Sequence, residues 1–197
     1  MFDLITKFLY LSTFLLTICI AEHYKRSDLN ECHNKIDFKA DGYDWQPFKT
    51  FIPISSIKNN YMCDNDTILN TKIYYNGETN FYILLSEHPY DPKPGDNAVK
   101  IFVGHHTNDA EIYKVFSKGT CMIRNSESNS KIFKKDYFTP VELLLSKESL
   151  DVFVPEREEP LLSCEHANFA KMKYVSVSYY GGTKSEYFVD CPCEIKS

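Results

Sequence analysis

Glycine and positive charge are both scarce in this sequence. Seven glycines among 197 residues leave no glycine-rich linker and no low-complexity segment. The formal net charge is −5, and no block of basic residues occurs. Because phosphate backbones are bound by clustered positive charge, the composition argues against a nucleic-acid partner. No long helix is expected, and no internal repeat of about 20 to 50 residues is found.

The aromatic residues point to β-structure. They make up 15% of the chain, with 14 Tyr, 14 Phe and a single Trp. Large flat rings pack well on a half-buried pleated surface, so this weighting favours sheets. Many short alternating runs, separated by turn signals, predict an all-β protein with a jelly-roll-like antiparallel β-sandwich.

The first residues have the pattern of a targeting segment. Lys7 precedes an apolar run, Phe8 to Ile20, which is too short to span a bilayer comfortably. We expect residues 1–21 to be a signal peptide and the mature chain to begin near Glu22, with a retained anchor as the alternative. No second apolar run of spanning length occurs, so we expect a secreted, extracellular protein with no membrane span after signal cleavage.

Six cysteines follow that segment, and in a secreted chain this number indicates three disulfides. They are Cys32, Cys63, Cys121, Cys164, Cys191 and Cys193. One N-glycosylation sequon, Asn65-Asp66-Thr67, lies in a polar stretch that we expect to be an exposed loop.

The spacing of the last two cysteines limits the pairing. A bond between Cys191 and Cys193 would close a very small strained ring, so each is expected to pair elsewhere. Both ends of a sandwich commonly meet at one side, so Cys32 and Cys63 are expected to take these two partners in an order left open. Cys121 and Cys164 then remain for each other.

The N-terminal half predicts an arm, a strand and a hairpin. Residues 22–46 are polar and are interpreted as an irregular N-terminal arm tied down by a disulfide. Pro47 to Ile57 predicts a strand, which Pro53 would place at a sheet edge or a bulge. Thr71 to Ser86 predicts a hairpin with a type I′ turn at Asn76-Gly77.

The C-terminal half predicts further strands. Ala98 to Phe116 reads as a strand, a polar turn and a second strand, because apolar residues alternate with period two. Thr139 to Val154 predicts a second hairpin, with a helix over VELLLSKESL as the competing interpretation. Further strands are expected at Cys121 to Ile123, Met172 to Tyr180 and Ser185 to Asp190.

Three segments in this order resemble the farnesoic acid O-methyltransferase domain, a module common in arthropod proteins. They are IFVGHHTNDAEIYKV, VELLLSKESLDVFVPEREEPLL and KYVSVSYYGG. The resemblance covers about residues 73–190. It implies a domain over residues 47–193, followed by a C-terminal tail at 194–197.

The family name implies methyl transfer from S-adenosylmethionine to farnesoic acid. Such a cofactor is usually held by a glycine-rich strand-to-helix loop, and the sequence has no G-x-G, no βαβ alternation and no G-x-S-x-G. We therefore expect no catalytic residues and no cofactor. The hypothesis is a secreted, non-catalytic recognition module for a glycan, a protein or a small apolar ligand. The alternatives are the methyltransferase and a structural or venom constituent.

Two groups of residues are candidates for binding. The turn with Gly104, His105, His106 and Asn108 could bind a ligand, although adjacent histidines in a strand face opposite ways and no partner carboxylate has metal-site spacing, so no metal is expected. Alternation would turn some strand tyrosines outward, where they suit recognition, unless the sandwich and its loops cover them. They are Tyr74, Tyr75, Tyr82, Tyr113, Tyr174, Tyr179 and Tyr180.

Overall fold

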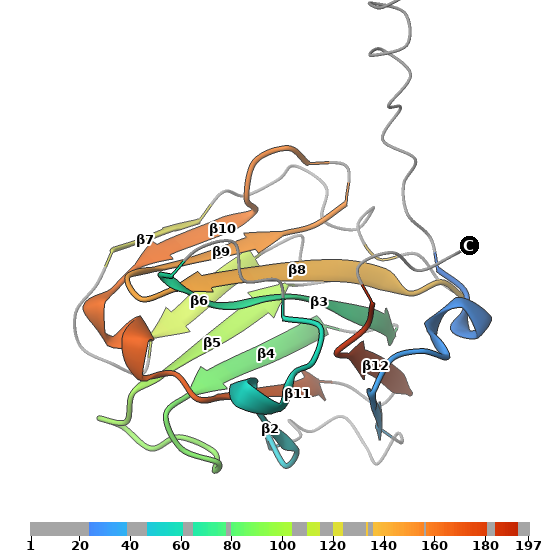
Figure 1. Cartoon of the computed structure of the whole chain (residues 1–197), viewed down its shortest axis with the longest axis horizontal. Coiled ribbons are helices and arrows are strands. Elements are labelled where there is room, and N and C mark those ends of the chain that lie inside the picture. The colour runs from blue at the N-terminus through green and yellow to red at the C-terminus, as the bar shows by residue number, and fades with distance from the viewer. Residues whose placement is uncertain are drawn as a thin grey trace, which may run out of the picture.

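A computed structural model of the chain describes most of the sequence. The described residues are 24–38, 47–60, 65–77, 80–103, 110–114, 120–123, 133, 136–155, 157–180 and 184–192. Within them the protein is all-β, with two antiparallel sheets packed as a sandwich (Figure 1). No helix in these ranges is long and apolar enough to cross a membrane.

The larger sheet has seven strands in the described ranges. They are β1 (Asn34–Phe38), β3 (Thr67–Gly77), β7 (Thr120–Ile123), β8 (Thr139–Ser146), β9 (Ser149–Phe153), β10 (Leu162–Glu165) and β12 (Ser185–Val189). Their spatial order is β1-β12-β3-β8-β9-β10-β7, so the first and last of the described strands lie side by side at one edge.

The smaller sheet has five strands in the same ranges. They are β2 (Phe51–Pro53), β4 (Asn80–Ser86), β5 (Ala98–Val103), β6 (Ala110–Lys114) and β11 (Tyr174–Tyr180). Their order is β2-β11-β4-β5-β6. Three short 3-10 turns, η1 (Arg26–Leu29), η2 (Ile54–Ser56) and η4 (Ala167–Lys171), complete the described elements.

The core lies between the two sheets and has an aromatic centre. The Tyr75 ring lies 5.2 Å from Phe81, 5.1 Å from Phe133 and 5.0 Å from Tyr187, measured between ring centroids. The Tyr187 hydroxyl crosses the sandwich and donates a 2.5 Å hydrogen bond to the carbonyl of Ser178 on β11. This bond satisfies the buried Tyr187 hydroxyl, which would destabilise the fold if it had no hydrogen-bond partner.

Several strand predictions from local alternation are confirmed. The Ala98 to Phe116 segment forms the antiparallel pair β5 and β6, and Thr139 to Val154 forms the hairpin β8 and β9, not a helix. The Ser146 hydroxyl accepts the backbone N–H of Ser149 at 2.8 Å and closes that turn. Pro53 lies in β2 at the edge of its sheet, as the missing N–H requires.

The predicted hairpin at Asn76-Gly77 is wrong. β3 and β4 belong to different sheets, and β3 continues through Gly77, which lies opposite Ser185 of β12. A Cβ at Gly77 would meet a ring carbon of Tyr75 at 2.6 Å and the Ser185 hydroxyl oxygen at 2.7 Å. Glycine is required here for close packing within the sheet and not for a turn.

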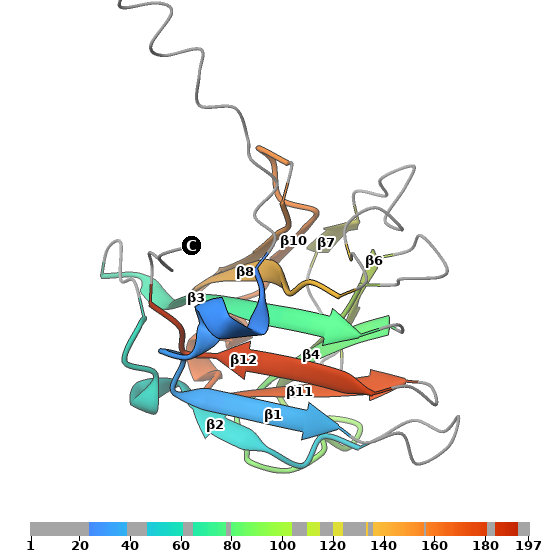
Figure 2. The ribbon, with the colours of Figure 1, turned by 90° about the vertical axis from the view of Figure 1, so that its right-hand side faces the viewer.

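The predicted irregular arm contains a strand that the sequence did not indicate. β1 pairs with β12 through five residues, and η1 lies over the sheet beside β12 and β3 (Figure 2). The few apolar residues of the arm find buried positions, since Leu29 is 0% and Ile36 is 8% exposed. Burial of such side chains stabilises the segment by about 1.5–3 kcal/mol each, an upper estimate.

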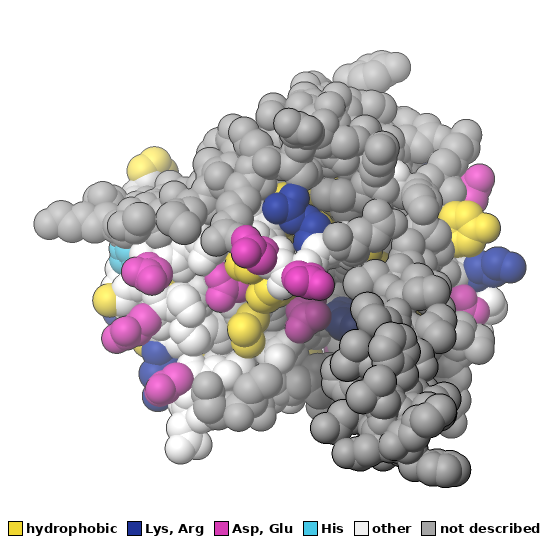
Figure 3. Space-filling model, turned by 90° about the horizontal axis from the view of Figure 1, so that it is seen from above, with side chains coloured by type: hydrophobic (Ala, Val, Ile, Leu, Met, Phe, Trp, Pro, Cys, Tyr) yellow, Lys and Arg dark blue, Asp and Glu magenta, His cyan; other side chains and the backbone are white. Residues whose placement is uncertain are grey.

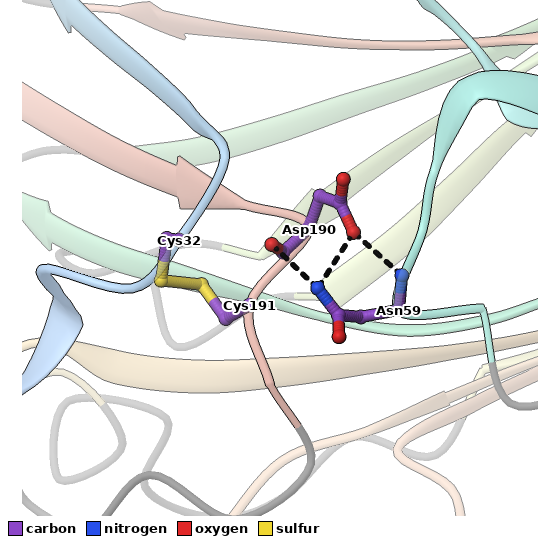
Figure 4. Close-up of a disulfide and its surroundings, with 4 residues drawn as sticks. All are labelled: Cys32, Asn59, Asp190 and Cys191. Carbon is purple, nitrogen blue, oxygen red and sulfur yellow. Dashed lines mark hydrogen bonds between the residues drawn. A yellow bond between two sulfur atoms is a disulfide. The ribbon is translucent and has the colours of Figure 1, made fainter.

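A disulfide and a buried aspartate join the N-terminal segment to the residues that follow β12 (Figure 4). Cys32 is bonded to Cys191, one of the two orders that the sequence left open. Next to it, Asp190 adopts a φ of 61° and its carboxylate accepts the backbone N–H of Asn59 at 2.7 Å and the side-chain amide at 2.9 Å. The Asp190 carbonyl accepts the N–H of His33 at 3.1 Å, so three separate segments meet at one residue.

The other cysteines are placed less completely. Cys164 is disulfide-bonded, and strand register sets Cys121 directly opposite it across β10 and β7. Cys63 and Cys193 lie outside the described residues. The pairing of Cys121 with Cys164, and of Cys63 with Cys193, stays a prediction.

Candidate ligand-binding face

Part of the outer surface of each sheet is covered by neighbouring chain. On the larger sheet, Leu29 packs with Tyr74, Phe138 and Phe188 over the β12 and β3 end. On the smaller sheet, Phe48 packs on Leu84 and Ala98. In these two clusters, apolar side chains that point away from the core are buried by other parts of the chain, which reduces the exposed apolar area of the sheets.

The rest of the larger sheet presents a polar surface with two apolar residues in it. The side chains come from four adjacent strands, β3, β8, β9 and β10, and each is half-buried. We call them the outer polar face: Asn70, Lys72, Glu142, Leu144, Asp151, Phe153 and Ser163. Alternation explains their direction, because the residues between them on each strand, such as Leu143 and Val152, belong to the core.

Strand register arranges this face in two rows. Lys72 lies opposite Glu142, which lies opposite Phe153. Asn70 lies opposite Leu144, which lies opposite Asp151, and that residue lies opposite Ser163. Directly opposite residues in antiparallel strands have Cβ atoms about 4.5–5.5 Å apart, so the seven side chains form one continuous surface.

Hydrogen bonds hold parts of the face in place. The Ser163 hydroxyl donates to the Asp151 carboxylate at 2.6 Å, across the β10 and β9 pair. At the β3 side, the backbone N–H of Asn70 donates to the side-chain oxygen of Asn60 at 2.8 Å. The Asn60 amide in turn donates to the carbonyl of Ile68 at 3.0 Å. The face is therefore built on strands, with its rim fixed before any ligand arrives.

The surroundings of the face are acidic. The β9–β10 connection carries a half-buried Arg157 with exposed Glu158 and Glu159 beside it. Seen from above in Figure 3, acidic side chains gather around a small group of hydrophobic side chains near the middle of the view. Such a surface offers hydrogen-bond acceptors in excess, together with a limited apolar area.

The comparisons with known proteins place the chain. A family model described as farnesoic acid O-methyl transferase matches residues 36–193. The chain belongs to this family. The match begins within β1 and continues past β12, so the family domain takes in the sandwich, and the resemblance found in the sequence is confirmed.

No curated protein matches the sequence. Among solved structures, galectin LEC-6 of Caenorhabditis elegans is 12% identical, with a TM-score of 0.44, over 78% of this chain and 94% of that chain.

Two of the tyrosines that the sequence offered for recognition are buried. Tyr75 lies in the aromatic core, at 1% exposed. Tyr74 points to the outside of its sheet, but Tyr24 covers it, with ring centroids 5.0 Å apart. Tyr82 and Tyr174 are half-buried. Of the predicted binding tyrosines with described side chains, none is exposed. For Tyr74 the reason is a cover from the N-terminal segment, Tyr24 and Leu29, that local alternation does not reveal.

The predicted binding turn is not tested. Gly104, His105, His106 and Asn108 lie outside the described residues, as do the side chains of Tyr113, Tyr179 and Tyr180. Within the described ranges, no group of three or more His, Cys, Asp or Glu side chains is placed to hold a metal ion.

Sequence reasoning missed the outer polar face. Phe153 stands in the run Leu150 to Val154, where every second residue is apolar and Phe153 itself looks like part of a continuous hydrophobic strand. Because Leu150, Val152 and Val154 belong to the core, alternation turns Phe153 to the outer side of the sheet, and its register with Glu142 on β8 agrees with this. Local alternation does not reveal the neighbours of Phe153 on this face, because β3 is brought beside β8 only by pairing between segments that are distant in sequence.

Proposed function

We propose that this chain is a secreted, non-catalytic recognition module that binds a carbohydrate on the outer polar face. The observation that supports the proposal is the position of Phe153 and Leu144. Both are half-buried on an otherwise polar sheet surface, and each lies in strand register beside a carboxylate, Glu142 or Asp151.

The chemistry of the face suits a sugar ring. A pyranose has an apolar C–H side, which packs on an aromatic ring, and a rim of hydroxyl groups. Carboxylates such as Asp151 and Glu142 accept hydrogen bonds from hydroxyls, and the Lys72 ammonium donates them. A few placed polar groups around an apolar contact give orientation and specificity in small-ligand sites.

Secretion is the second part of the proposal. The Cys32–Cys191 disulfide supports it, because such bonds persist in oxidising compartments. The predicted signal peptide at residues 1–21 and the exposed position of Asn65 agree with it. N-terminal sequencing of secreted protein should give a start near Glu22, and retention of residues 1–21 would contradict this localisation.

A glycan array, followed by calorimetry with the best glycan on the array, tests the binding role. Phe153→Ala removes the apolar contact and Asp151→Asn removes an acceptor charge, and each is expected to weaken binding about tenfold, as for loss of roughly 1.4 kcal/mol. Tyr174→Ala is the matched control, since it removes a half-buried ring from the other sheet. Circular dichroism checks that each variant is folded.

The outcomes are distinct. Glycan binding that survives both face substitutions would place the site elsewhere, and a folded protein that binds no glycan on the array would refute carbohydrate recognition.

The family description motivates one competing function, methyl transfer. Incubation of the protein with labelled S-adenosylmethionine and farnesoic acid tests it directly. Methyl ester above the protein-free blank would overturn the non-catalytic part of the proposal.

A further inference from the structure

Among the described strands, β1 has a neighbour on one side, β12, and ends the larger sheet (Figure 2). The N–H of His33 donates to the carbonyl of Asp190 at 3.1 Å, and this pair continues the register of β1 with β12. Because backbone bonds alternate along antiparallel strands, every second residue of β1 turns its N–H and C=O groups to the open side. These residues are Asn34, Ile36 and Phe38. Such a row of donors and acceptors is a template for another strand.

The edge at β1 differs from the edge at β2. The strand β2 has three residues and ends with Pro53, which has no N–H to offer to a further strand. The strand β1 has five residues, and none of them is proline. Its exposed side chains, Lys35 and Asp37, stand two residues apart on one face of the strand and carry opposite charges.

The surroundings of Asp37 favour a further cation. Towards β12, Asp37 lies directly opposite Glu186, and like charges in that position destabilise a strand pair. The Lys35 nitrogen lies 2.6 Å from a carboxylate oxygen of Asp37 and 3.6 Å from one of Glu186. Arg26 and Lys184 also form ion pairs with Glu186, at 3.2 and 3.5 Å. The Asp37 side chain stays 45% exposed, so a second lysine can reach it.

We propose that β1 pairs with β1 of a second copy of this chain, antiparallel about Ile36, so that the larger sheets of the two copies join edge to edge. In this register Lys35 of each copy lies opposite Asp37 of the other. The same patch then serves both copies, as in most two-fold dimers. The open backbone groups pair with their own kind, Ile36 with Ile36 and Asn34 with Phe38.

The sequence of β1 selects this register against its neighbours. A shift by one residue would set side chains of the outer face against side chains of the core face. A shift by two would set Lys35 opposite Lys35, or Asp37 opposite Asp37. A single lysine on an edge keeps copies apart, but Lys35 with Asp37 is complementary to itself. The choice of a second copy as partner rests on this pattern and not on net charge.

The contact is small, so monomer and dimer are expected to be in an equilibrium that shifts with concentration. The strand β12 separates β1 from β3 and the outer polar face, so the pairing does not depend on carbohydrate binding.

Sedimentation equilibrium of the mature, disulfide-bonded chain tests the proposal. Between roughly 1 µM and 1 mM the measured mass should rise from one chain towards two. Lys35→Glu and Asp37→Lys should each weaken the dimer about tenfold or more, because each sets like charges opposite one another at two places. Lys147→Glu makes the same change of charge at an exposed lysine that pairs with Asp66 outside β1, and it should leave the dimer unchanged.

Mixing the two variants separates pairing from folding. An equimolar mixture of Lys35→Glu and Asp37→Lys should dimerise again, because every altered charge of one variant meets its opposite in the other. A variant with both changes in one chain should also dimerise. Damage within one chain would not be repaired by mixing, and circular dichroism checks that each variant is folded.

Hydrogen exchange locates the contact. The Ile36 amide faces the open side and should gain protection as concentration rises, whereas the Lys35 amide, directed to β12, should not change. The proposal is overturned if the mass stays that of one chain, if Lys35→Glu dimerises as the unchanged protein does, or if the mixture stays monomeric. None of these outcomes bears on the glycan array result.

Discussion

Removal of the Cys32–Cys191 bond is the most informative perturbation of this fold. The double change Cys32→Ser with Cys191→Ser removes the bond without leaving a buried free thiol. The two cysteines are 159 residues apart, so the bond constrains most of the unfolded chain.

The size of the effect follows from chain entropy. Closing a loop of this length is worth about 5 kcal/mol in the loop-closure model, and typical measured values are about 2–4 kcal/mol. The disulfide that holds Cys164 already restricts part of the loop, so we expect a loss of about 3 kcal/mol. For a chain of this size each kcal/mol shifts Tm by roughly 2–4 °C, which gives a fall of about 6–12 °C.

Thermal and urea unfolding measure the total loss, and hydrogen exchange locates it. The amides of β1 should lose protection first, because few apolar contacts besides Leu29 and Ile36 hold the N-terminal segment. The amides of β8, in the middle of the sheet, should keep theirs. A decrease in Tm of less than about 2 °C, or an equal loss of protection in β1 and β8, would refute the reasoning.

Three further predictions concern single residues. Gly77→Ala should destabilise the protein by about 1–3 kcal/mol in urea unfolding, because the new Cβ would meet the buried Tyr75 ring; an unchanged midpoint would contradict this close packing. Although desolvation acts to raise it, the pKa of Asp37 is lowered by hydrogen bonds and charge, chiefly those of Lys35. The stabilisation from the ionised Asp37 carboxylate is present above about pH 4 and is lost as pH falls through the lowered pKa. The difference in stability between the protein and its Lys35→Ala variant should therefore shrink between about pH 5 and pH 2. A difference that stays constant over this range would count against the pair. Asn65 should carry a glycan in protein from a eukaryotic secretory host, and no mass change on glycosidase treatment would disprove it.

Local alternation was enough to predict individual strands. The β5 and β6 pair and the β8 and β9 hairpin each join residues that are close in sequence, so pattern and turn chemistry agree. The edge position of the strand that contains Pro53 was also predictable locally, because proline has no backbone N–H and fits only where no neighbouring strand needs that donor.

Assignment of strands to sheets could not be predicted in the same way. Asn76-Gly77 has the composition of a tight turn, yet β3 and β4 separate there into opposite layers. Whether β3 continues or turns at Asn76-Gly77 depends on its pairing with β12, more than 100 residues away in sequence, and on the close approach of Gly77 to Ser185. The candidate binding face has the same origin, because alternation turns Phe153 outward but only long-range strand pairing places Asn70 and Lys72 of β3 beside the β8–β9 hairpin.

The pairing of β1 with β12 sets an order for biosynthesis. Translation delivers β1 before the other described strands, but within the described structure its one partner is β12, which follows all of them in sequence. Until then β3 presents an unpaired edge and Cys32 has no Cys191 to meet. The nascent chain must therefore keep both an open sheet edge and a reactive thiol from other partners, which makes early termination shortly before Ser185 a route to aggregation and to wrongly paired cysteines.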